Sequence, residues 1–214
     1  MASDPFPGVN PQFTFADGRT ELMSWSWEGI PGAVSRLLEL GADPNVRAPD
    51  GSTALLVAIQ GAANPDVVHK LLEAGADPNA KDEGGVTPLM YLVERKDKAT
   101  PDAFQSMIFK ALIDAGADLE ARHNGGNTAL LCAASRNNLS YARALVEAGA
   151  RLDVKNKLGR NALDVTDMSS RTRTTRCANY LRAVMKERGL LRRHESATIE
   201  ALDKATDSSK SYLR

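Results

Sequence analysis

The sequence predicts an all-α fold, a solenoid of stacked helix–turn–helix units with short hairpin-like turns. One motif, Gly-Ala-Asp or a close variant, returns at Gly41, Gly75, Gly116 and Gly149. A second motif has Thr or Asn two residues after a glycine and Leu four residues after it; it returns at Gly18, Gly51, Gly85, Gly126 and Gly159. Both series share a spacing of 33 or 34 residues and a single lengthening to 41. Two independent landmarks with a common period indicate a repeat architecture.

Each unit carries signals for two helices. The threonine after the turn glycine can cap the first helix, as Thr53, Thr87 and Thr128 would. Residues 64–66 and 100–102 then offer an N-cap, a proline at the first helical position and an acid in the first turn. The glycine that ends each unit suits a left-handed C-terminal cap, which favours a residue without Cβ. Because one helix pair cannot bury its apolar face alone, we expect neighbouring units to stack.

With these motifs the chain resembles the ankyrin repeat family. The family's opening tetrapeptide is kept in part as Thr87-Pro88-Leu89-Met90, and its closing Gly-Ala-Asp-x-Asn is intact at residues 41–45 and 75–79. The resemblance implies one domain over residues 15–189, with five repeats at about 15–47, 48–81, 82–122, 123–155 and 156–189. The family's histidine after the Leu is replaced by Met23, Leu56, Met90, Leu131 and Asp164. Since that histidine helps to tie neighbouring turns in the family, we expect this stack to depend more on aliphatic packing.

The ends and one interval depart from the regular pattern. We expect an irregular segment over residues 1–14, a polar tail over 190–214, and a capping helix around 177–186 whose Leu181, Val184 and Met185 face the fourth repeat. Gly85 to Gly116 spans 31 residues, against 24 for Gly51 to Gly75. The excess falls near the polar residues 94–101, which predicts an exposed loop between the two helices of the third repeat. This 95–101 insertion is either a tolerated surface insertion or a partner-contacting loop.

Composition excludes several classes of protein. With 27 basic and 27 acidic side chains the net charge is zero, which disfavours a generic polyanion binder. Two cysteines cannot build a disulfide framework, and no apolar run approaches the length of a membrane span. We therefore expect a cytoplasmic protein without a membrane segment.

The sequence offers no catalytic constellation. His69, His123 and His194 belong to different parts of a unit, and the glycines recur with the repeat instead of clustering into a phosphate-binding loop. Cys132 lies in an apolar first helix, where a small core residue is expected more than a nucleophile. We expect no catalytic residue, no metal and no cofactor, and hence no enzyme.

The resemblance implies that a protein partner binds the concave surface, made by the turn tips and the exposed side of the first helices. Carried over residue by residue, the candidates are Trp27, Arg47, Asp50, Gln60, Lys81, Glu83, Tyr91, Arg95, Arg122, Asn127, Arg136 and Lys155. Four of them place a basic residue before the turn in successive units, which is either a binding column or ordinary surface. Trp27 and Tyr91 are the candidate anchors, because aromatic residues dominate interface energetics. Trp25 and Trp27, two residues apart on a short helix, should point to different sides.

The leading hypothesis is a non-enzymatic protein–protein interaction module, monomeric when free, that presents a preformed surface to one partner. An inhibitor or immunity protein that occludes a toxin or enzyme is an alternative within this class. A different class is nucleic-acid binding through the basic segment 171–193, which is disfavoured because Tyr180 is its only aromatic residue. Residues 1–80 hold ten acids and four bases, whereas 171–193 hold eight bases and one acid, so the array should be acidic at one end and basic at the other.

Overall fold

The computed structural model describes residues 8–95, 103–169 and 175–191, without the side chains of residues 167–169. Ten helices lie in these ranges: α1 (Glu21–Glu28), α2 (Pro31–Glu39), α3 (Ala54–Gln60), α4 (Pro65–Glu73), α5 (Pro88–Glu94), α6 (Ala103–Asp114), α7 (Ala129–Ser135), α8 (Leu139–Glu147), α9 (Ala162–Ser169) and α10 (Arg176–Glu187). The described residues contain no strand, and only an isolated antiparallel bridge joins Thr14 to Thr20. The predicted all-α helical solenoid is confirmed.

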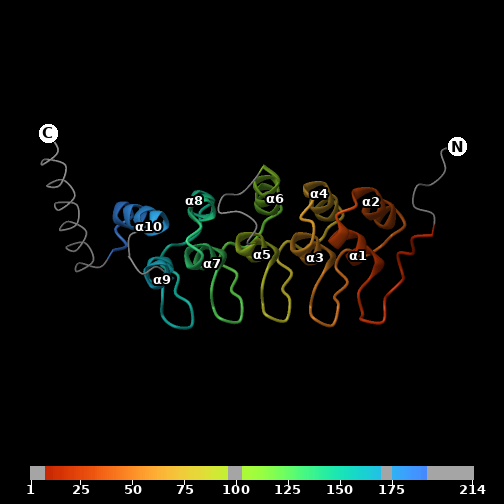
Figure 1. Ribbon diagram of the computed structural model, residues 1–214, viewed down its shortest axis with the longest axis horizontal. Coiled ribbons are helices and arrows are strands. Elements are labelled where there is room, and N and C mark those ends of the chain that lie inside the picture. Colours follow the sequence, from red (N-terminus) through yellow and green to blue (C-terminus); the bar gives the residue numbers. More distant parts are fainter. Residues whose placement is uncertain (1–7, 96–102, 170–174, 192–214) are drawn as a thin grey trace, which may run out of the picture.

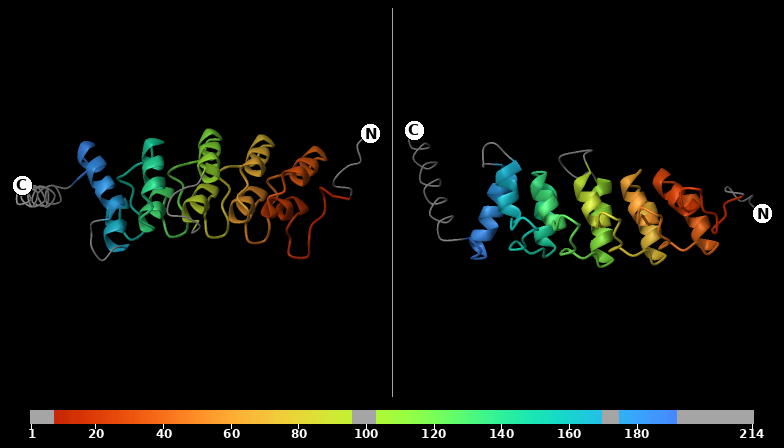
Figure 2. Two further views of the ribbon diagram at one scale, coloured as in Figure 1. Left: turned by 45° about the horizontal axis from the view of Figure 1, so that its top comes forward. Right: turned by 90° about the horizontal axis from the view of Figure 1, so that it is seen from below.

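The helices form two parallel rows along an elongated array (Figure 1). The first helices of the pairs, α1, α3, α5, α7 and α9, make an inner row, and each contacts the next one along. The second helices make an outer row on the side away from the loops, which extend below the inner row in Figure 1. Two further views keep the same order of pairs (Figure 2).

Threonine caps begin the inner helices, as predicted. The hydroxyls of Thr53, Thr87 and Thr128 each accept a hydrogen bond from the backbone N–H three residues later. In the fifth repeat Asn161 does the same work: its Oδ1 accepts from the Asp164 N–H at 2.9 Å, while the Asp164 carboxylate accepts from the Asn161 N–H at 3.0 Å. This reciprocal pair is a capping box. The cap predicted at residues 100–102 lies outside the described residues.

The core runs along the whole array between the two rows. Leu37, Leu71, Leu112 and Leu145, one from each of the outer helices α2 to α8, are all fully buried. At the C-terminal end Leu181 and Met185 are buried, Val184 packs against the core, and α10 contacts both α8 and α9. The expected capping role of this helix toward the fourth repeat is therefore confirmed. The expected tail falls almost wholly in residues 192–214, outside the described part of the chain.

The turn after each outer helix is closed as the glycine pattern predicts. Gly75 has φ of 84°, its N–H donates to Leu72 O at 3.0 Å, and the Ala76 N–H donates to Leu71 O at 2.9 Å. This pair of bonds satisfies carbonyls that the helix end leaves open.

Side chains next to these turns tie each repeat to the following one. The Asn45 amide donates to Gly75 O and accepts from the Asp77 N–H, both at 2.8 Å. Asn79 repeats the arrangement one unit later, with Gly116 O at 3.1 Å and the Asp118 N–H at 2.7 Å. The stack therefore combines aliphatic packing with an asparagine ladder, which the expectation of a mainly aliphatic stack did not include.

The long third repeat divides its extra residues between two places. Helix α6 has 12 residues, whereas α4 has nine. Placing the whole excess in a loop was thus wrong in part, because three of the seven residues extend α6. Of the predicted 95–101 insertion, residues 96–101 lie outside the described residues.

Candidate functional site

Five hairpins of one geometry project from the inner row; hairpins 1 to 5 are residues 15–19, 48–52, 82–86, 123–127 and 156–160. In each, the first residue's N–H donates to the carbonyl of the last, and the fourth residue's N–H donates back to the carbonyl of the first. The fourth residue is always a glycine with φ between 72° and 82°. This is a three-residue loop with a type I turn and a left-handed glycine.

Neighbouring hairpins are joined to one another. The Glu83 N–H donates to Asp50 O at 3.1 Å, the Asn124 N–H donates to Gly84 O at 2.8 Å, and the Lys157 N–H donates to Gly125 O at 3.4 Å. Hairpins 2 and 3 approach so closely that a Cβ on Gly51 would lie 2.9 Å from the Glu83 nitrogen. Hairpins 2 to 5 therefore form a continuous edge whose spacing is set by backbone contacts, and hairpin 1 is linked to it by the Arg19–Asp50 ion pair.

The predicted basic column stands on the arms that lead into the hairpins. The Arg47 guanidinium donates to the Lys81 carbonyl, and Arg122 Nη1 donates to the Lys155 carbonyl at 2.6 Å. All four side chains are exposed. Each arginine thus ties its repeat to the next, and the lysine that follows it projects freely from the surface.

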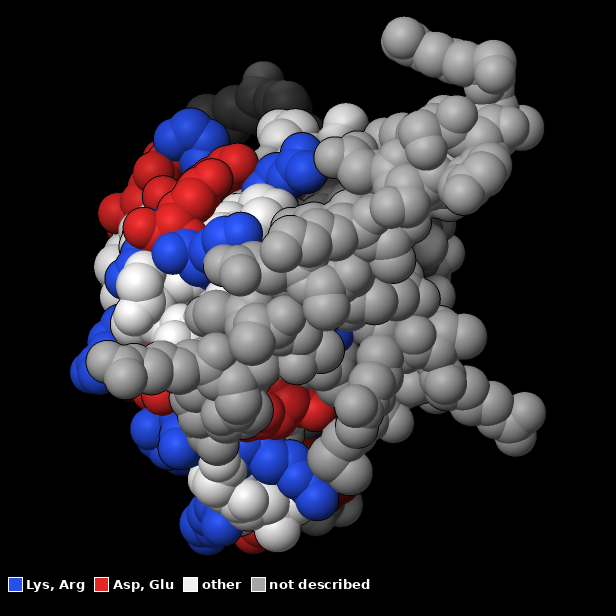
Figure 3. Space-filling model, turned by 90° about the vertical axis from the view of Figure 1, so that its left-hand side faces the viewer, with Lys and Arg blue, Asp and Glu red and all other residues white. Residues whose placement is uncertain are grey.

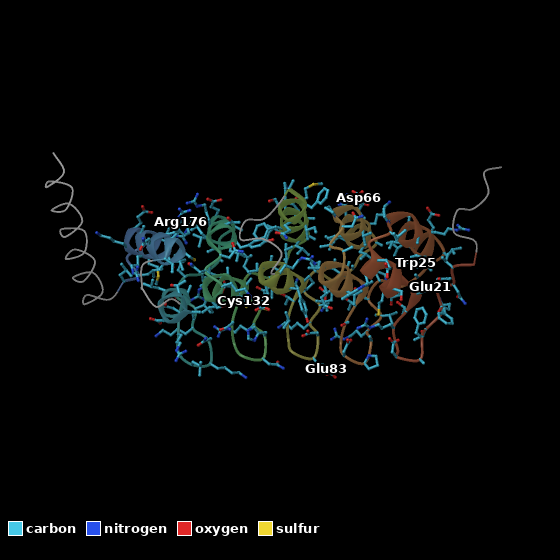
Figure 4. All side chains as sticks on the ribbon, viewed as in Figure 1. Glu21, Trp25, Asp66, Glu83, Cys132 and Arg176 are labelled. Carbon is cyan, nitrogen blue, oxygen red and sulfur yellow. The ribbon has the colours of Figure 1, made fainter. Side chains whose placement is uncertain are left out.

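The polar candidates of the hairpins are fixed by local bonds. Asp50 Oδ1 accepts from the Ser52 N–H at 2.9 Å, and Asp50 Oδ2 lies 3.5 Å from Arg19 Nη2. The backbone hydrogen bond from Ser52, helped by Arg19, lowers the pKa of Asp50 below its usual value. Asn127 Oδ1 accepts from Asn156 Nδ2 at 2.9 Å, whereas Glu83 lies exposed at the tip of hairpin 3 (Figure 4).

The two tryptophans of α1 differ in exposure, as their spacing predicts. Trp25 is half-buried and packs against the core, and its Nε1 donates to Glu21 Oε1 at 3.3 Å. Trp27 is 43% exposed. By distance from the N-cap, Trp27 aligns with Gln60, Glu94 and Ser135 at the C-terminal ends of the inner helices. Trp27 is therefore the aromatic side chain that remains open on the inner helices of the candidate surface, while Phe15 of hairpin 1 is 40% exposed.

Tyr91 joins its helix to its own hairpin. Its hydroxyl donates to Asp82 Oδ2 at 2.5 Å, and Asp82 Oδ1 accepts from the Val86 N–H at 2.8 Å. Burial, and then the hydrogen bond and charge of Asp82, raise the pKa of Tyr91 well above its ordinary value. Tyr91 thus stays neutral and holds hairpin 3 in place, instead of standing open as the sequence suggested for an anchor.

Arg95 reaches back from the end of α5 to the end of α3. Its Nη1 donates to the carbonyls of Ile59 and Gly61, the latter at 2.9 Å, with Gln60 O at 3.4 Å. A cation at the C-terminus of a helix is stabilising, because the last carbonyls point toward it. Arg95 is half-buried and is a cap for the preceding repeat, a role that the sequence analysis missed.

The fourth repeat contributes Arg136, exposed at the C-terminal end of α7, and the same helix carries the buried Cys132 (Figure 4). Burial, followed by the charge of Glu94, raises the pKa of Cys132. Burial also raises the pKa of Cys177, to about 11. Because the thiolate is the reactive form, both thiols suit a structural role.

Metal-ligand clusters and membrane-spanning helices are both absent from the described residues. In that part of the chain no three His, Cys, Asp or Glu side chains gather as metal ligands would. Nor does any helix there combine the length and the apolar character needed to span a bilayer.

Comparison with protein families gives a direct result. The family model described as "Ankyrin repeats (3 copies)" matches residues 22–100 and 99–182, well over half of the chain. The chain belongs to the ankyrin repeat family. A search of curated proteins finds no match. Ankyrin repeats generally mediate protein–protein interaction, and the family is typically non-enzymatic.

Proposed function

We propose that this ankyrin array is a protein-binding module whose partner contacts the hairpin edge and the adjoining ends of the inner helices. The observation that supports this most is the hairpin edge itself, where five loops share one geometry and hydrogen bonds join hairpins 2 to 5. A surface that is ordered before binding loses little conformational entropy on docking. The partner then binds as a near-rigid body.

The candidate residues divide by what they can offer a partner. Trp27, Lys81, Glu83, Arg136 and Lys155 are exposed, and they supply one large anchor and both signs of charge. Arg95, Tyr91 and Asn127 contribute indirectly, because they position the end of α3, hairpin 3 and hairpin 5. On this view Trp27 gives most of the binding energy, since aromatic anchors cost about 2 kcal/mol or more when truncated in an interface.

Occlusion of an enzyme or toxin is a form of the same binding. Nucleic-acid binding through residues 171–193 is less favoured, because the Tyr180 ring, its one aromatic group, is covered by the Arg143 guanidinium at 5.3 Å from the ring centroid. Four of the basic residues in that segment, Arg171, Arg173, Arg192 and Arg193, lie outside the described residues.

Site-specific photo-crosslinking tests the proposed surface. A photoreactive residue is placed at Gln60 or Glu83 on the proposed face, and at Met107 on the outer helix α6 as the control. Met107 is 55% exposed, so it offers the competing apolar surface. We expect a partner from the host extract to crosslink at Gln60 and Glu83 and not at Met107. Crosslinks at Met107 alone, or equally at all three, would refute the assignment.

A further inference from the structure

We propose that hairpins 4 and 5 form a docking patch for an acidic segment of the partner that also carries an apolar side chain. This inference rests on the proposed function and assigns a chemistry to one end of the binding surface. Hairpins 1 to 3 and their arms carry both signs of charge. Residues 121–127 and 154–160, which form the corresponding part of repeats 4 and 5, hold no Asp or Glu. Their basic residues are Arg122, Lys155, Lys157 and Arg160.

These cations are available to a ligand. Arg122, Lys155 and Lys157 are exposed and Arg160 is half-exposed. Seen from the C-terminal end, Lys and Arg prevail along the lower edge, on the side where the hairpins lie (Figure 3). The loops therefore present a basic end to a surface whose other loops are mixed in charge.

An apolar side chain stands in the middle of this charge. Leu158, at the tip of hairpin 5, is 70% exposed, more than any other large apolar side chain of the described residues. The turn holds it there: Asn156 Oδ1 accepts from the Leu158 N–H at 2.9 Å and from the Arg160 N–H at 3.1 Å. A leucine flanked by cations is complementary to a segment of a partner protein in which acidic residues flank an apolar one.

The patch is built before any ligand binds. Arg122 Nη1 donates to Lys155 O at 2.6 Å, and Asn156 Nδ2 donates to Asn127 Oδ1 at 2.9 Å. The Lys157 N–H adds a backbone bond to Gly125 O at 3.4 Å. Three contacts thus fix hairpin 5 against hairpin 4, so the cations are held at one spacing.

Three acids flank the patch in the sequence, and each has a partner elsewhere. Glu120 Oε1 accepts a hydrogen bond from the Arg151 N–H at 2.8 Å. Asp153 pairs with Arg151, with 2.9 Å between carboxylate and guanidinium, and the Arg151 side chain in turn lies outside the patch. Asp164 accepts from the Asn161 N–H at the start of α9. Each of the three carboxylates therefore already has a partner outside the patch.

The chemistry favours an acidic protein segment over a nucleic acid. Hairpins 4 and 5 contain no Phe, Tyr or Trp on which bases can stack. His123, the one ring present, accepts a hydrogen bond from the Gly125 N–H through Nδ1 at 2.7 Å. Four cations around a leucine suit side-chain carboxylates on a short stretch of polypeptide.

The test selects a displayed library of random peptides on the full chain. We expect the selected peptides to be enriched in Asp and Glu next to an apolar residue. The variant Lys155→Gln/Lys157→Gln/Arg160→Gln should lose that enrichment. Its affinity for a selected, fluorescein-labelled peptide should fall roughly 3- to 100-fold by anisotropy, as expected for three exposed ion pairs. Leu158→Ser should lower the affinity about 3- to 10-fold.

A matched control removes three charges from other surfaces. The variant Lys70→Gln/Lys110→Gln/Lys186→Gln has the same net charge and should keep the acidic enrichment. Peptides no richer in acids than the library, or an enrichment that survives the hairpin variant, would overturn the proposal. So would a labelled single-stranded oligonucleotide that binds more tightly than the selected peptides and depends on the same residues. Crosslinking at Gln60 and Glu83 reports on the proposed function separately, because those residues lie outside the patch.

Discussion

The hairpin edge and the outer helices of the same array use their polar side chains in opposite ways. On the hairpin side, Arg47, Arg122 and Asn124 donate to backbone carbonyls of the next or the preceding repeat. On the outer helices, ion pairs form within one helix, as between Lys110 and Asp114 at 2.5 Å or Arg36 and Glu39 at 3.6 Å. Open grooves of about 480 and 430 Å³ separate α2 from α4 and α4 from α6. Polar bonds between repeats thus recur along the hairpin edge, whereas one side-chain bond, from the Tyr141 hydroxyl to Gln105 Oε1 at 3.4 Å, joins the outer helices α8 and α6.

The largest contrast is between the shared core and the outer surface. Leu71→Ala removes a fully buried side chain at the contact of α4 with its neighbours, and should cost about 2–5 kcal/mol. Met107→Ala, at a position 55% exposed on α6, should change the free energy of unfolding by less than about 0.5 kcal/mol. Urea denaturation measures both. Similar costs for the two variants would mean that the outer face is part of the core.

Removing one residue of the asparagine ladder should give the next largest loss of stability. Asn79→Ala removes two hydrogen bonds to the following repeat and should cost about 1–2 kcal/mol. Lys110→Ala, which removes an exposed pair inside one helix, should cost at most about 0.5 kcal/mol. Urea denaturation with far-UV circular dichroism compares them. If the lysine variant proved the less stable of the two, the asparagine ladder would not be a main source of coupling between repeats.

Removing the hydrogen bonds of Arg95 to the end of α3 should lower the free energy of unfolding by a smaller amount. Arg95→Ala leaves the last carbonyls of α3 without their cation and should cost about 1 kcal/mol. Arg95→Lys should recover part of this, because a cation remains near the helix end. Thermal denaturation of the three proteins checks the order. Equal melting temperatures for wild type and Arg95→Ala would exclude a capping role.

The smallest effect is a pH dependence at hairpin 2. The folded-state pKa of Asp50 is lowered by the Ser52 N–H and Arg19, so its carboxylate stabilises the fold above the unfolded-state pKa of about 4. This contribution is lost as the pH falls through the folded-state pKa. Because the side chain is 52% exposed, we expect less than about 0.5 kcal/mol. The stability difference between wild type and Asp50→Asn should shrink between about pH 5 and pH 2; a constant difference would contradict the assignment.

Much of the fold is encoded locally, which is why the sequence predicts it. The Thr53 cap and the Gly75 turn depend on neighbours within a few residues, and the repeat period places them in order. The role of Arg95 depends on where the end of α5 meets α3. The residues around Arg95 in the sequence do not indicate that contact. The repeated Gly-Ala-Asp-x-Asn motif marks Asn45 as a recurring residue. Its bonds to residues 75 and 77, however, exist only because the repeats stack, and the sequence does not show which atoms the stacking brings together.

For the candidate site, the sequence predicts which residues lie on the hairpins and inner helices, and it separates Trp27 from Trp25. It does not predict which of them are already bonded. Tyr91 was chosen as an anchor from its residue type, whereas its hydroxyl is used by Asp82 nine residues earlier. Leu158 was not chosen, because a single leucine between lysine and glycine carries no signal until the turn shows it at the tip.

The bonded hairpin edge also determines how the array can bend. Backbone hydrogen bonds between hairpins 2 to 5 resist stretching, whereas no backbone hydrogen bond of the described residues crosses the grooves between α2, α4 and α6. Bending therefore alters the outer helices first and leaves the pitch of the hairpins nearly constant. The hairpin edge is therefore the side of the array whose length changes least on bending. A partner that spans several hairpins meets them at the same spacing whether the array is straight or curved.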